Sequence, residues 1–114
     1  MPRSAWLLFL VACGVPADLP RDRYADVAAD VYCQRLRECA RGQFERAHFG
    51  ARDCRAGAAM DFELIARAAE ADDCGYREAA AGEAVRELRT MSCADFYEEA
   101  YVEAFDALWD CSGE

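Results

Sequence analysis

Residues 21–41, RDRYADVAADVYCQRLRECAR, carry the pattern that decides the fold of this chain. Apolar side chains recur there every three or four positions, which is the spacing of one face of an α-helix. Charged and amide side chains fill the positions between them, so the helix is expected to have one buried and one solvated face. The apolar set is Tyr24, Val27, Ala28, Val31, Tyr32, Leu36 and Cys39. The stretch predicts a long amphipathic helix that starts near Pro20, a residue that suits a helix start.

The rest of the chain predicts three more helices, over about 52–71, over about 77–90, and from Ser92 onward. The last begins with Ser92-Cys93-Ala94-Asp95, which resembles a capping box with Asp in place of the usual Glu. Residues 42–50 break the helical pattern, and no alternating strand pattern is evident. We therefore expect an all-α fold, a small disulfide-stapled four-helix bundle that runs up-down-up-down, as one domain over residues 21–114.

The N-terminus has the features of a bacterial lipoprotein leader. A short apolar run, residues 5–12, ends in Leu10-Val11-Ala12-Cys13, which reads as a lipobox. The run is far shorter than the roughly 20 residues of a spanning helix. We expect residues 1–12 to be a signal peptide that is cleaved between Ala12 and Cys13, with acyl chains on Cys13 and a short tether over 13–20. The alternative is an ordinary secretory signal that is cleaved after Ala17.

The lipobox and the charge together predict where the protein resides and what it contacts. Gly14, rather than an Asp that retains some lipoproteins in the inner membrane, follows Cys13, so we expect lipid anchoring in the bacterial cell envelope at the outer membrane. The net charge of −9 argues against nucleic acid as a partner, because phosphate binding needs clustered Arg or Lys. The acyl group is then the expected membrane contact.

Six further cysteines remain in this exported domain, an even number that predicts three disulfides. Cys33 and Cys39 point about 120° apart on one helix, so they cannot bond to each other. An up-down-up-down order places the other cysteines at the two ends of the bundle. The expected pairs are Cys39–Cys54, Cys33–Cys93 and Cys74–Cys111, and the competing scheme exchanges Cys33 and Cys39.

The same cysteines raise an alternative function, a metal-binding or thiol-redox domain that uses the six cysteines and His48. The chain lacks the Cys-x-x-Cys pair that is typical of zinc knuckles and thiol oxidoreductases. An oxidising compartment also favours disulfides over free thiols. We therefore expect no catalytic residue, no metal ligand and no cofactor.

The aromatic side chains of the last helix form a ridge beside an acidic stripe: Tyr101, Phe105 and Trp109. Two interpretations stay open, because such a ridge either packs in the core or binds a partner. We expect a non-catalytic protein-binding or structural module, with this ridge as its candidate contact surface for an envelope protein.

The cysteine framework also resembles that of a known group. The stretches Tyr32-Cys33-Gln34-Arg35, Phe49-Gly50-Ala51-Arg52-Asp53-Cys54, Cys74-Gly75-Tyr76 and Ser92-Cys93-Ala94-Asp95-Phe96-Tyr97 are similar to small cysteine-rich lipoproteins of high-GC bacteria. The resemblance covers most of the mature chain and consists mainly of cysteines and helix caps. It implies an envelope location and a six-cysteine helical domain, and it implies no activity.

Overall fold

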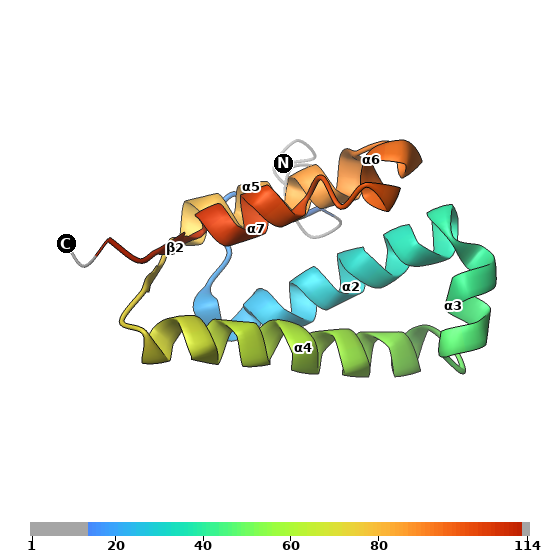
Figure 1. Ribbon diagram of the computed structural model, residues 1–114, viewed down its shortest axis with the longest axis horizontal. Helices are drawn as coiled ribbons and strands as arrows, with labels where there is room; N and C mark the ends of the chain where they lie inside the picture. Colours follow the sequence, from blue (N-terminus) through green and yellow to red (C-terminus); the bar gives the residue numbers. More distant parts are fainter. Residues whose placement is uncertain (1–13, 113–114) are drawn as a thin grey trace, which may run out of the picture.

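The computed structural model describes residues 14–112, and the described part of the chain is mostly helical (Figure 1). Residues 1–12, Cys13 and residues 113–114 lie outside the described residues. The helices are α2 (Arg21–Cys39), α3 (Arg41–Ala47), α4 (Ala51–Ala71), α5 (Glu78–Thr90), α6 (Cys93–Tyr97) and α7 (Val102–Ala107), and the strands are β1 (Gly75–Tyr76) and β2 (Trp109–Asp110). The predicted all-α class is confirmed, whereas the described chain has six helices in place of four.

The central element is α2, which packs against α4 on one side and against α5 and α6 on the other. Figure 1 shows α4 along one edge of the molecule, α5 and α7 along the opposite edge, and α3 across one end. After α2 the chain turns into α3 across the end of the molecule, and the next long helix, α4, then runs back antiparallel to α2. This arrangement leaves the two long faces of α2 covered by different parts of the chain.

The core combines small residues with a chain of aromatic rings. Tyr24 is 2 % exposed, and its ring contacts those of Phe62, Tyr76, Phe105 and Trp109 with centroids 5.6–6.4 Å apart. Alanines on α2 and α5 are fully buried between the helices, where a larger side chain would separate the backbones. The rings, together with the fully buried Leu19, Leu88 and Leu108, provide the apolar area that alanines cannot.

The prediction of one continuous fourth helix is wrong, because two short helices, α6 and α7, occupy that part of the chain. The chain leaves α6 through Glu99, which has a positive φ of 58°. The amide of Ala100 donates to the carbonyl of Asp95 and that of Glu99 donates to Phe96, as in a Schellman motif. The break turns Tyr101 and Phe105 toward α2 and α4. At the start of α6, Ser92 Oγ accepts from the amide of Asp95 at 3.1 Å, so the predicted cap is confirmed.

The structure also adds two elements that the pattern did not predict. Within residues 42–50, which the pattern predicts to be a break, the chain forms most of α3 around one buried side chain, Phe44. The strands β1 and β2 pair antiparallel, with Gly75 opposite Asp110 and Tyr76 opposite Trp109. Strands of two residues are too short to show an alternating pattern, so periodicity cannot find them.

The three disulfides join Cys33 to Cys54, Cys39 to Cys93, and Cys74 to Cys111. The expected Cys74–Cys111 pair is present, whereas Cys39–Cys54 and Cys33–Cys93 are wrong and the exchanged scheme is the one observed. The reason is α3, which spans the end of the molecule. The first turns of α4 therefore lie beside α2 well before its last turn, where Cys33 is within reach. Cys39, in that last turn, meets α6.

Candidate functional site

The predicted aromatic ridge does not form one exposed surface. Phe105 is only 9 % exposed and packs on Tyr24 and Phe62, so it belongs to the core. Trp109 is half-buried against Tyr24 and Tyr76. For Phe105, the core interpretation is therefore the one observed, and a partner surface stays a prediction only for the more exposed part of the ridge. Tyr101 is half-buried like Trp109, but it lines a groove at the surface.

This groove, which we call the tyrosine groove, lies where α2, α4 and the turn before α7 meet. It has a volume of about 170 Å³ and is lined by Tyr32, Ala58, Asp61, Phe62, Ile65 and Tyr101. The Tyr32 ring lies edge-on to both Tyr101 and Phe62, with centroids 6.3 Å away in each case. The lining is mostly apolar, with Asp61 as its one charged residue, and Ile65 at its rim is 60 % exposed. Such a groove can take up an apolar side chain.

The electrostatics of the groove combine neutral walls with an acidic rim. Burial, together with Tyr32 and Glu99, raises the pKa of Tyr101 to about 12. Burial, with Glu99 and Asp61, also raises the pKa of Tyr32. Both hydroxyls therefore stay protonated near neutral pH, while Glu99 and Asp61 carry negative charge close by. The segment that supplies Tyr101 has no basic residue between Cys93 and Ser112.

Two neighbouring apolar side chains of α4 provide a useful contrast. Leu64 is 58 % exposed, about as much as Ile65, yet it does not line the tyrosine groove. Leu64 lies instead with Met60 beside Asp22 and Asp26 of α2. The two residues are adjacent in sequence and about 100° apart around the helix. A comparison of Ile65 with Leu64 therefore distinguishes an effect of the tyrosine groove from an effect of any exposed apolar side chain on α4.

The residues of the metal or redox alternative do not form a site in the structure. All six of the other cysteines are in disulfides, so none is a free thiol. His48 places Nδ1 3.3 Å from Asp53 Oδ2, and the same carboxylate accepts from the amide of Phe49. This contact helps to order the start of α4. Within residues 14–112, no group of three or more His, Cys, Asp or Glu side chains could hold a metal ion.

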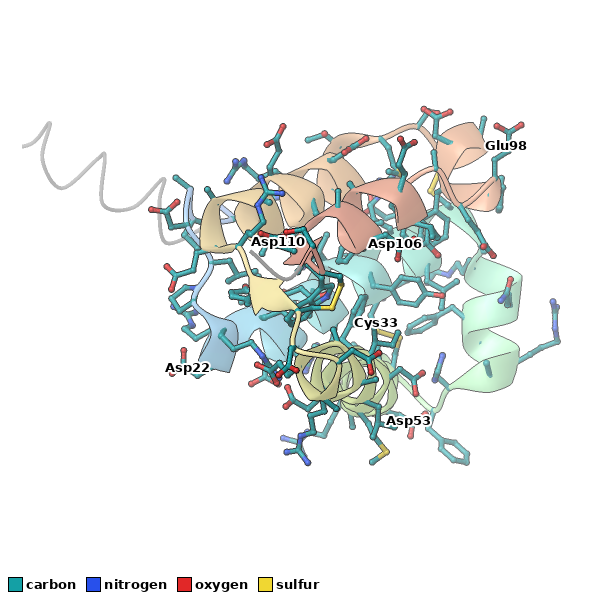
Figure 2. The ribbon with its side chains drawn as sticks, turned by 60° about the vertical axis from the view of Figure 1, so that its left-hand side comes forward. Asp22, Cys33, Asp53, Glu98, Asp106 and Asp110 are labelled. Atoms are coloured by element: carbon teal, nitrogen blue, oxygen red, sulfur yellow. A yellow bond between two sulfur atoms is a disulfide. The ribbon has the colours of Figure 1, made fainter. Side chains whose placement is uncertain are left out.

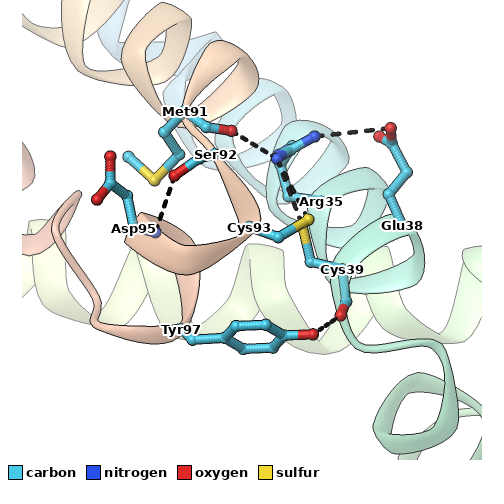
Figure 3. The surroundings of a disulfide bond; sticks show 8 residues. All are labelled: Arg35, Glu38, Cys39, Met91, Ser92, Cys93, Asp95 and Tyr97. Atoms are coloured by element: carbon cyan, nitrogen blue, oxygen red, sulfur yellow. Dashed lines mark hydrogen bonds and ion pairs between the residues drawn. A yellow bond between two sulfur atoms is a disulfide. The ribbon is translucent and has the colours of Figure 1, made fainter.

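Sequence reasoning missed Arg35, which joins α2 to the chain beside the Cys39–Cys93 disulfide (Figure 3). Its Nη2 donates to the carbonyl of Met91 at 2.6 Å, and its Nη1 lies 3.6 Å from Glu38 Oε2. The Tyr97 hydroxyl donates to the carbonyl of Cys39 on the other side of the bond. Arg35 therefore serves the packing of α6 on α2. Arginine is so common in this chain that composition gave no signal for this role.

Comparison with known proteins provides no further assignment: no protein-family model, curated protein or solved structure matches this chain. Among the helices of residues 14–112, none has the length and apolar character needed to cross a bilayer.

Proposed function

We propose that this chain is a lipoprotein of the bacterial cell envelope, a non-catalytic protein-binding module that is held at the outer membrane by an acylated Cys13. One observation carries the proposal. The chain has seven cysteines, and six of them pair with one another. The cysteine that is left over is the one in the lipobox. A leftover cysteine in an exported protein calls for a separate explanation, and lipidation provides it.

The tyrosine groove is the proposed binding site of this module. Its size suits one large apolar side chain, and its acidic rim favours a partner segment with Arg or Lys beside that side chain. The net charge of −9 strengthens attraction to a basic partner from a distance. We therefore propose, as the occupant, an apolar side chain within a basic segment of another envelope protein.

A pair of photo-crosslinking variants tests the proposed site in intact cells. A photoreactive phenylalanine analogue replaces Ile65 in one variant and Leu64 in the other, so that the helix and the exposed fraction of the side chain are matched. We expect a discrete adduct from position 65 and none from position 64, and we expect the crosslinked peptide of the partner to carry Arg or Lys. Equal adducts from both positions, or none from position 65, would contradict the proposed site.

A further inference from the structure

Residues 14–19, which we call the N-terminal strap, are packed on the domain, whereas the sequence predicts only a short tether over 13–20. Leu19 is fully buried, its amide donates to the carbonyl of Glu78 at 3.0 Å, and its carbonyl accepts from the Tyr76 hydroxyl. These contacts attach the strap to the start of α5 and to β1. The chain just before α2 is therefore part of the core.

The strap continues along α5, whose surface is shaped for it. A Cβ at Gly82 would lie 2.4 Å from the carbonyl oxygen of Ala17 and 2.7 Å from that of Pro16. Arg86 Nη1 donates to the same two carbonyls, at 3.4 and 2.8 Å respectively. Only a glycine at position 82 permits this approach, and the arginine one turn further satisfies the exposed carbonyls.

The first residue of the strap, Gly14, lies at a groove between α2 and α5. That groove is also lined by Val15, Pro16, Arg23, Asp26, Val27, Asp30, Val31, Gln34 and Arg89. Cys13 directly precedes Gly14, and consecutive Cα atoms are about 3.8 Å apart. Acyl chains on Cys13 would therefore leave the protein next to this groove, with almost no slack.

We propose that the N-terminal strap holds the domain in one orientation on the bilayer, with the α2–α5 groove against the lipid headgroups and the tyrosine groove facing away. The inference rests on the proposed acylation of Cys13. Tyr32 and Gln34 are two positions apart on α2, which places them about 200° apart around the helix. The side of α2 that bears Gln34 faces the anchor, so the side that bears Tyr32 faces the periplasmic or extracellular space, where a partner can reach it.

The distribution of charge supports this orientation. The groove lining combines Arg23 and Arg89 with Asp26 and Asp30, and this mixture of both charges suits zwitterionic headgroups. The α6 end of the acidic α6–α7 segment lies away from the strap. Figure 2 shows the strap, in blue at the left, on the opposite side of the ribbon from Glu98 of that segment. An anionic bilayer repels that acidic segment and so favours the same orientation.

The absence of lysine from this chain permits a direct test. The acylated protein is purified from membranes as two single-lysine variants, Gln34→Lys beside the strap and Ala107→Lys on α7. Each is labelled with an amine-reactive fluorophore and reconstituted in vesicles of phosphatidylethanolamine and phosphatidylglycerol that contain a headgroup-attached quencher. The lysine-free protein, treated identically, gives the background from the N-terminal amine. We expect quenching to be several-fold stronger at position 34 than at position 107.

Two glycine variants show whether the strap causes the difference. Gly82→Ala in the labelled proteins displaces the strap, so quenching at the two positions should become equal. Gly57→Ala is the matched control, because a Cβ there meets no atom within 4 Å, and it should leave the difference intact. If Gly82→Ala lowers the folded fraction in circular dichroism, Arg86→Gln replaces it. The inference would be overturned if quenching at positions 34 and 107 were equal in proteins that keep Gly82. It would also be overturned if the difference between the two positions survived the loss of the strap contacts. Failure of the protein to float with the vesicles would overturn the acylation as well.

Discussion

Arg21, at the first turn of α2, joins α2 to α4 through ion pairs, in addition to the Cys33–Cys54 disulfide. Its guanidinium lies 3.0 Å from carboxylate oxygens of both Glu63 and Glu70, and Arg67 adds a second donor to Glu63. The same guanidinium lies 5.9 Å from the centroid of the Trp109 ring. Isolated surface ion pairs contribute little, whereas a network with several partners on two helices is more effective. This network therefore sets the packing of α2 on the second half of α4.

The network predicts a pH dependence of stability. Hydrogen bonds from Arg21 and Arg67 lower the pKa of Glu63 from 4.5 to about 2. A carboxylate whose pKa is lower in the folded than in the unfolded chain stabilises the folded state at pH values above its unfolded-state pKa. This contribution is lost as the pH falls toward 2. Between pH 5 and pH 2 we expect the melting temperature to fall further for the unaltered protein than for Glu63→Gln. Circular dichroism melts across this range measure the difference, and parallel curves would contradict the assignment.

At the scale of helices and strands, length decides how well the pattern predicts. The long helices α2, α4 and α5 begin and end within about two residues of their predicted bounds, since several turns of periodic apolar residues define each one. The short helix α3 depends on the burial of one side chain, Phe44, and the break after α6 depends on a single left-handed residue, Glu99. Features that depend on one tertiary contact or one dihedral angle carry no periodic signal. The sequence pattern therefore misses them.

Glu99 makes the break testable. It occupies the left-handed position of a Schellman motif, where glycine avoids the cost of a Cβ. We expect Glu99→Gly to stabilise the fold by about 1 kcal/mol and Glu99→Ala to give no such gain. Asp73, with φ 63°, occupies the same position after α4, and Asp73→Gly should gain less, because aspartate tolerates this conformation better than glutamate. Urea unfolding of the variants measures the differences, and a loss of stability in Glu99→Gly would contradict the motif.

At the scale of the whole molecule, the number of cysteines predicted three disulfides. The sequence pattern did not predict which partners Cys33 and Cys39 have, or which residues meet in the tyrosine groove. The pairing of Cys33 and Cys39 depends on the unpredicted α3, and the tyrosine groove takes its residues from α2, α4 and the turn before α7. Tyr101 was identified as a candidate, but Tyr32, Phe62 and Ile65 belong with it only through the packing of the helices. The same holds for the strap, whose place on α5 follows from Gly82. Periodicity describes a single helix and says nothing about which turns meet.

Trypsin digestion without reduction tests the disulfide framework, since cleavage after arginine separates most of the cysteines. The structure predicts that peptide 24–35 is linked to peptide 53–55 through Cys33 and Cys54. It also predicts that peptides 38–41 and 68–77 are both linked to peptide 90–114. Recovery of 38–41 joined to 53–55 would instead show that Cys39 bonds to Cys54 and would contradict the observed arrangement.

The most direct test of the account is the intact mass of the mature protein, taken from the membrane fraction after treatment with iodoacetamide and without reduction. We expect a chain that begins at Cys13, carries the added mass of acyl chains, and has no alkylated cysteine. That result establishes the anchor and places the other six cysteines in three bridges. A chain without lipid would contradict the envelope anchor and the orientation that depends on it. Alkylated cysteines would contradict the disulfide framework and would return metal or thiol chemistry to consideration.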